Sequence, residues 1–173
     1  GTLTAGQGTN TVTFTPGASG NVSISCLVTA SCGSQNVAGV STIDPACKGP
    51  LRFYTLEPCR VLDTRDADGP YGGPALGAGE ERLWKVGGRC GVPLTAKSVS
   101  ANVTVLQPSS TGSLRLYPAT SAPPNASAIS FFPGVTRASS SMVPLSGAGE
   151  VKVYADLPSG ATHMILDVSG YFE

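Results

Sequence analysis

The chain has 173 residues with 11 basic and 11 acidic side chains, so its formal net charge is zero at neutral pH. This balance argues against a nucleic-acid-binding protein, which needs clustered lysine and arginine, and no apolar run reaches the roughly 18 residues of a membrane helix. Charged residues make up only 13% of the chain, whereas glycine (22) and proline (14) are abundant, a composition that favours turns and short strands over helices.

The N-terminal part of the sequence stands apart because residues 1–43 carry no charge, and Asp44 is the first charged residue. Within this part, residues 11–15 and 21–26 alternate polar and apolar side chains, which predicts two half-buried strands separated by a turn. A segment of about 45 residues is too short to enclose a hydrophobic core of its own. We therefore expect residues 1–50 to dock on the rest of this chain or on a neighbouring chain.

Beyond residue 50 the sequence reads as a succession of short strands separated by turns rich in glycine and proline. The expected strands cover residues 51–55, 59–63, 81–86, 98–106, 113–117, 128–132, 141–145, 151–155 and 163–168. Strands at such intervals, without a helical period, indicate an all-β fold, either a β-sandwich or a jelly-roll-like domain. The predicted organisation is an uncharged N-terminal strand segment, residues 1–50, followed by a β-sandwich module, residues 51–173.

The five cysteines favour disulfides over a metal site, because the sequence contains no Cys-x-x-Cys pair and only one histidine. We predict a disulfide between Cys59 and Cys90 and a second one between two of Cys26, Cys32 and Cys47. The remaining thiol would be free or would pair with another chain. Disulfides in turn indicate an oxidising location, outside the cell or on its surface.

The stretch from Phe53 to Arg65 reads F-x-x-x-x-P-x-R-V-L-D-T-R, and residues 165–172 read I-L-D-V-S-G-Y-F. Together with C-G-V-P at residues 90–93 and the stretches at residues 96–105 and 112–118, these motifs resemble a module of secreted and cell-surface proteins of environmental bacteria. The resemblance covers residues 51–173 and implies an extracellular β-module without an assigned activity. No signal-peptide pattern opens the sequence, so Gly1 is expected to begin a secreted chain whose signal peptide has been removed.

The triplet Asp63-Thr64-Arg65 is the most distinctive part of these motifs. It could form a polar corner that binds a ligand. Alternatively, Asp63 and Arg65, together with Arg60, could fix the end of a strand through charge-assisted hydrogen bonds. Because no acid, base or nucleophile stands beside the triplet, we favour the structural interpretation.

The same loop offers a weak calcium candidate, because Asp63, Asp66 and Asp68 precede Gly69 and could supply oxygen ligands. The glutamate that closes an EF-hand loop is missing, so an ordinary Asp-Gly-Pro turn is the favoured interpretation. No resident metal or other cofactor is expected.

No group of residues indicates catalysis. The single histidine, His163, lies four residues from Asp167 in an expected strand, which separates the two by roughly 13 Å. The serine nucleophile motif Gly-x-Ser-x-Gly is absent, and Ser139-Ser140-Ser141 is expected to lie in a loop. The protein is therefore not expected to be an enzyme.

Two functional hypotheses remain. Leu3, Val12 and Phe14 lie in the uncharged segment, whose strands could complete the sheet of a neighbouring copy or pair with an edge of their own domain. The first hypothesis is a non-enzymatic extracellular structural protein that assembles into a bacterial surface filament or layer. The alternative is a monomeric module that binds cell-wall or other polysaccharide, with Tyr71 as an exposed aromatic contact in a glycine-rich loop.

Overall fold

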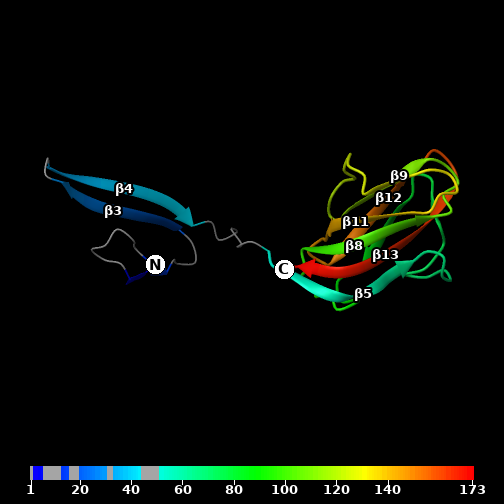
Figure 1. Cartoon of the computed structure of the whole chain (residues 1–173), viewed down its shortest axis with the longest axis horizontal. Coiled ribbons are helices and arrows are strands. Elements are labelled where there is room, and N and C mark those ends of the chain that lie inside the picture. The colour runs from blue at the N-terminus through cyan, green and yellow to red at the C-terminus, as the bar shows by residue number, and fades with distance from the viewer. Residues whose placement is uncertain (1, 6–12, 16–19, 31–32, 44–50) are drawn as a thin grey trace. The chain divides into compact units, whose positions relative to one another are not determined.

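The computed structural model describes residues 2–5, 13–15, 20–30, 33–43 and 51–173; in the first 50 residues it describes only the backbone of the strands. The chain divides into two compact units, Gly1–Pro50 and Leu51–Glu173 (Figure 1). These described residues contain no α-helix, and each strand pair among them is antiparallel.

Within the N-terminal unit, the described strands form two separate hairpins. β1 (Thr2–Ala5) pairs with β2 (Thr13–Thr15), and β3 (Gly20–Ala30) pairs with β4 (Gly33–Ile43). The strands expected at residues 11–15 and 21–26 correspond to β2 and the first half of β3. Their partners β1 and β4 were not anticipated, because β1 is very short and β4 lacks a regular polar-apolar alternation.

Among the residues assigned to a possible assembly strand, Leu3 in β1 lies opposite Phe14 in β2. Val12 lies outside the described residues. Cys32 and Cys47 also lie outside them, whereas Cys26 lies in β3, opposite Val37 of β4.

The second unit is a sandwich of two antiparallel sheets. Its strands are β5 (Phe53–Asp63), β6 (Leu76–Gly77), β7 (Glu81–Lys85), β8 (Ser98–Leu106), β9 (Gly112–Pro118), β10 (Ile129–Phe131), β11 (Arg137–Pro144), β12 (Glu150–Asp156) and β13 (Ala161–Phe172). The first sheet has the order β11-β8-β13-β5, with the short β6 also paired to β13, and the second has the order β10-β9-β12-β7. The predicted all-β sandwich is thereby confirmed.

The hydrophobic core lies between the two sheets and follows from the two-residue period of the strands. In β8, Val99, Ala101, Val103 and Val105 are buried, while the intervening polar residues are only partly covered. The second sheet contributes alternate positions of β12 in the same way. The largest fully buried side chains include Trp84, Phe131, Leu62, Leu76 and Leu114.

The structure differs from the expected strands in several places, and β6 was not expected. The strands expected at residues 51–55 and 59–63 correspond to one strand, β5, which begins at Phe53, because its pairing with β13 continues through an irregular region between Thr55 and Cys59. Ser139-Ser140-Ser141, expected in a loop, lie in the middle of β11, where each serine has a register partner in β8. Strand propensity depends on the neighbours with which a segment pairs, and these serines pair with a strongly β-forming strand.

Candidate functional site

The end of β5 is fixed by the Asp63 carboxylate, which is only 4% exposed. Arg65 donates to it from its backbone nitrogen (3.1 Å), from Nε (2.9 Å) and from Nη2 (2.6 Å), and Arg60 donates from Nη1 (3.2 Å). The hydrogen bond from the Arg65 side chain is the main reason that the pKa of Asp63 falls to about 2. The triplet therefore forms a corner in which this chain's own donors surround the carboxylate.

Arg60 also joins the edge strand β5 to its neighbour β13. It lies opposite Asp167 in the register of β5 and β13, and its Nε and Nη2 donate to the two oxygens of Asp167 at 2.8 and 3.3 Å. Hydrogen bonding to Asp167 is the first cause that raises the pKa of Arg60. The pair is partly exposed and, with Pro58 and Cys59, lines a shallow pocket.

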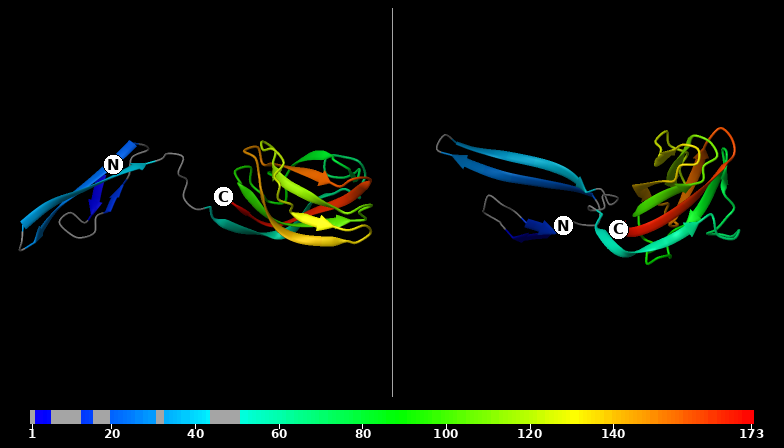
Figure 2. Two further views of the ribbon diagram at one scale, coloured as in Figure 1. Left: turned by 90° about the horizontal axis from the view of Figure 1, so that it is seen from above. Right: turned by 45° about the vertical axis from the view of Figure 1, so that its right-hand side comes forward.

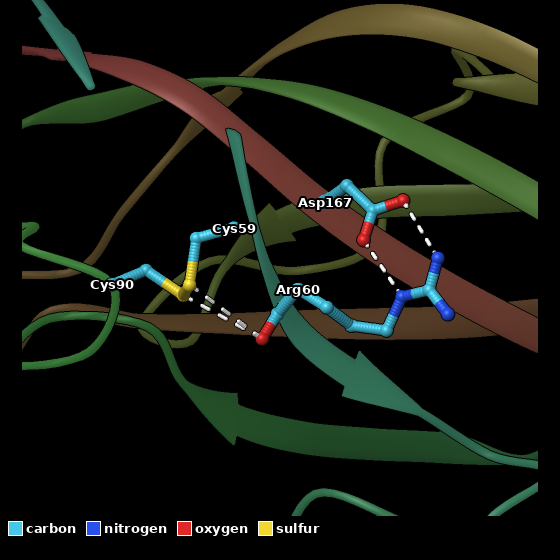
Figure 3. The surroundings of a disulfide bond; sticks show 4 residues. All are labelled: Cys59, Arg60, Cys90 and Asp167. Carbon is cyan, nitrogen blue, oxygen red and sulfur yellow. Dashed lines mark hydrogen bonds and ion pairs between the residues drawn. A yellow bond between two sulfur atoms is a disulfide. The ribbon is translucent and has the colours of Figure 1, made fainter. Parts of the chain in front are cut away.

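The predicted disulfide between Cys59 and Cys90 is confirmed. Figure 3 shows the Arg60 carbonyl oxygen directed toward the two sulfur atoms, while the Arg60 side chain extends away from them toward Asp167. The disulfide thus connects the start of the ion-paired corner to the loop that follows β7. It is a structural link in a half-buried position.

The aspartates considered for calcium do not form a cation site in the structure. The Asp63 carboxylate already accepts hydrogen bonds from Arg60 and Arg65. The loop after it is closed by backbone hydrogen bonds, including one that the Gly73 backbone nitrogen donates to the Asp66 carbonyl oxygen at 3.0 Å. The Asp68 carboxylate lies so close to Gly73 that a Cβ there would be 2.7 Å from its Oδ1. Among the described residues, no three His, Cys, Asp or Glu side chains are grouped to hold a metal ion.

His163 faces Thr64 rather than a nucleophile. Its Nδ1 lies 3.0 Å from the Thr64 carbonyl oxygen, to which it can donate, and 3.1 Å from Thr64 Oγ1. The buried Thr64 hydroxyl in turn accepts from the backbone nitrogen of Met164 at 2.8 Å. This arrangement ties the corner after β5 to β13 and gives His163 a positional role.

Tyr71, expected to be exposed, is half-buried. The loop folds back so that the Asp63 backbone nitrogen donates to the Tyr71 carbonyl at 3.0 Å, and the ring packs against the core. The Arg89 guanidinium carbon lies 3.6 Å from the centre of the ring, so a cation–π contact covers it. The prediction that the Tyr71 ring is exposed is therefore wrong.

Exposed aromatic rings occur instead where β5 begins. Phe53 is 48% exposed and Tyr54 41% exposed, and each pairs with a ring of β13: Phe53 with Phe172 at 4.9 Å and Tyr54 with Tyr171 at 5.1 Å between centroids. The sequence motifs gave no indication that these rings are exposed. Only the strand order shows that β5 is an edge strand, where such rings reach solvent.

The first sheet has two outermost strands, β5 and β11, and they differ in how their edges are protected (Figure 2). β5 is interrupted by an irregularity, contains Pro58 and is held at its end by the loop carrying Tyr71. Irregularities and proline are common devices that prevent further strand pairing. β11 has no such irregularity, because all eight of its residues pair in unbroken register with β8, and its proline, Pro144, is its last residue.

A groove runs beside β11. Its lining is Leu116, Pro124, Ala126, Ser127, Ala128, Ser141, Met142 and Val143. None of these side chains is charged, and Met142 is 73% exposed. We call this feature, the outer edge of β11 with the groove beside it, the open-edge groove.

In the facing sheet, β10 extends along only part of β9. Its three residues lie opposite Leu114, Ser113 and Gly112, so β10 does not reach Leu116, which lines the groove.

No protein-family model matches the chain, and no curated protein matches it. The part of the chain that the structure describes has no helix long and apolar enough to cross a membrane. The function is therefore inferred from the fold, the site geometry and the sequence motifs.

Proposed function

We propose that this protein is a non-enzymatic, extracellular structural protein whose copies assemble into a bacterial surface filament or layer through addition of N-terminal strands. One observation carries the proposal. The chain combines an N-terminal unit whose described strands form two-stranded sheets with a sandwich whose outermost strand β11 is regular over eight residues.

The N-terminal unit is the part of the chain that would donate a strand. Its described strands form two-stranded sheets only, and an isolated two-stranded hairpin is marginally stable in water. Its sequence is free of charge up to Asp44, so its strands can enter an apolar surface without burying a charged group. A segment of this kind gains stability by pairing with an existing sheet.

The extracellular location is supported by three features of different kinds. The Cys59–Cys90 disulfide is stable in oxidising compartments. Few side chains are charged, and the motifs from Phe53 to Arg65 and at residues 165–172 resemble those of secreted bacterial surface modules. A stable, disulfide-linked sandwich suits a protein that must persist outside the cell.

A structural role also suits the polar groups of the sandwich. The distinctive carboxylate, Asp63, is neutralised by Arg60 and Arg65, and His163 is turned toward Thr64. A catalytic acid or base exchanges a proton with the substrate, and its own pKa lies near the working pH. The low pKa of Asp63 supports a permanent ion pair instead.

The alternative function, binding of cell-wall or other polysaccharide by a monomer, is supported by a different observation. Phe53 and Tyr54 are both exposed in β5, and because successive side chains of a strand point to opposite faces, each ring could stack against a sugar on its own side of the sheet. Pull-down with insoluble peptidoglycan and cellulose tests it. Under the alternative, Phe53→Ala with Tyr54→Ala abolishes retention while Phe132→Ala, which removes another exposed ring, leaves it unchanged.

The experiment that tests the main proposal compares the full oxidised chain with a chain that lacks residues 1–15. Light scattering after size-exclusion chromatography measures the mass of each, and negative-stain electron microscopy shows its form. We expect large regular assemblies from the full chain and single copies from the shortened one. Equal assembly by both chains would contradict strand addition by this segment.

A further inference from the structure

We propose that the open-edge groove is the acceptor for a strand from residues 1–15 of a second copy of this chain. This inference rests on the proposed function, and it deepens that function by naming the acceptor surface and its partner. The incoming strand would pair with β11 and place its apolar side chains in the groove.

The backbone of β11 is the first reason. A strand at the edge of a sheet presents unpaired N–H and C=O groups along its outer side, which act as a template for another strand. β11 offers eight consecutive residues in regular register, whereas the irregular pairing and Pro58 interrupt β5. Among the two outermost strands of this sheet, β11 is therefore the better acceptor.

The chemistry of the groove is the second reason. Successive side chains of a strand point to opposite sides, so a strand added to β11 would direct every second side chain toward the groove. The sequence Thr11-Val12-Thr13-Phe14-Thr15 has this alternation, with two apolar side chains between threonines. No residue that lines the groove is charged, and Leu116, Met142 and Val143 contribute apolar side chains, so the groove can receive Val12 and Phe14.

The weakness of the donor hairpin is the third reason. β1 and β2 pair at three positions, with an irregularity between Leu3 and Ala5, whereas β3 and β4 pair at eleven. Releasing a strand requires loss of these pairs, so residues 1–15 can be freed at a much lower cost than the β3–β4 hairpin. β11 has eight residues, so it offers the released strand a longer partner than the four-residue β1 does.

The cysteine count favours a second copy as the donor. The chain has five cysteines, and the Cys59–Cys90 disulfide leaves three, so at least one of Cys26, Cys32 and Cys47 cannot form a disulfide within the chain. An odd cysteine in a disulfide-bonded protein suits a bond between chains. Each copy would then carry one donor and one acceptor, a head-to-tail contact that can repeat into a filament.

The test uses three full-length variants. In the acceptor-blocked variant, Ser141→Lys places an inward-pointing charge in the groove, as natural edge strands do to prevent pairing. In the donor-blocked variant, Val12→Asp and Phe14→Asp put charges into the segment that would enter the groove. Thr55→Lys is the matched control, because it adds the same charge to the rival edge strand β5.

Folding of each variant is checked by the fluorescence of Trp84, the single tryptophan, which is 2% exposed in the core. If Ser141→Lys fails this check, Ser127→Lys on the opposite wall of the groove replaces it. Light scattering then measures the mass of each protein alone and of the two blocked variants mixed in equal amounts.

We expect the Thr55→Lys control to assemble like the unaltered chain, and each blocked variant to show at least a tenfold smaller assembled fraction. The mixture should form a dimer of twice the 17.4 kDa of one chain, because one partner keeps its donor and the other its acceptor. A mixture that stays monomeric would overturn the assignment of β11 as the acceptor. So would assembly that is lost in Thr55→Lys but kept in Ser141→Lys. Neither result would contradict assembly through the N-terminal strands. An unaltered chain that is itself monomeric would overturn the proposed function as well.

Discussion

Substitution of Asp63 by asparagine should lower the free energy of unfolding of the sandwich by about 2 kcal/mol at pH 7. The carboxylate is only 4% exposed and accepts hydrogen bonds from both Arg65 and Arg60. Asparagine has nearly the same shape, but it removes the negative charge and places an N–H₂ group toward donors. Two guanidinium groups would then lose their shared partner.

The magnitude follows from the pKa of Asp63. A fall from the ordinary value of 3.8 to about 2 corresponds to about 2.5 kcal/mol of differential stabilisation. We reduce this to about 2 kcal/mol because Arg60 and Arg65 are 50% and 45% exposed, and water screens their charges. The depressed pKa means that this stabilisation is complete above about pH 4 and is lost as the pH falls through about 2.

The assay is urea unfolding followed by Trp84 fluorescence at several pH values between 7 and 2. The difference between the unaltered protein and Asp63→Asn should be largest at pH 7 and shrink as the pH approaches 2. Asp167→Asn is the control, because its pair with Arg60 is partly exposed and should contribute less than about 1 kcal/mol. Equal effects of the two substitutions, or a difference independent of pH, would refute the assigned role of Asp63.

Three further predictions concern the same sandwich. Reduction of the Cys59–Cys90 disulfide, with a sequence separation of 31, should lower stability by about 3–4 kcal/mol, measured by urea unfolding with and without reductant. Gly170→Ala should destabilise the sandwich by about 1–3 kcal/mol, because a Cβ at this position would lie 2.5 Å from the Phe53 ring and 2.7 Å from the Tyr54 carbonyl oxygen. Gly147→Ala is the control, because a Cβ there would have no atom within 4 Å. Thr64→Val should cost about 1–3 kcal/mol in thermal or urea unfolding, because the buried Met164 N–H loses its acceptor, whereas Thr104→Val on the partly covered outer face of β8 should cost less. Unchanged stability in Gly170→Ala or Thr64→Val would contradict the contact assigned to that residue.

The sequence predicted the sandwich well because its strands carry a strong two-residue period. In β8 and β12, apolar residues occupy alternate positions, and these are the positions that the core buries. The Cys59–Cys90 disulfide was also predicted from the sequence. Both features depend on residue types along the chain and need no knowledge of which strands are neighbours.

Features that depend on strand order were not predictable in this way. The sequence pattern does not show that Phe53 and Tyr54 are exposed; their rings reach solvent where β5 forms the edge of its sheet. Ser139 to Ser141 have the composition of a loop, and only pairing with β8 makes them a strand. The ring of Tyr71 is covered by Arg89, eighteen positions further along the chain, through a loop conformation that no local pattern indicates.

The open-edge groove belongs to the same group of features. Its walls come from β9, from the loop before β10 and from β11, and their proximity arises only when the two sheets pack together. The uncharged donor segment is visible in the sequence. The surface that could receive it is visible only in the fold.

Negative-stain electron microscopy of the full-length oxidised protein tests self-assembly most directly. We expect regular filaments or sheets, built from repeating units of one sandwich each, that disappear when Val12 and Phe14 are replaced by aspartate. Dispersed single particles of the unaltered chain, under oxidising conditions that keep its disulfide intact, would contradict strand-dependent assembly.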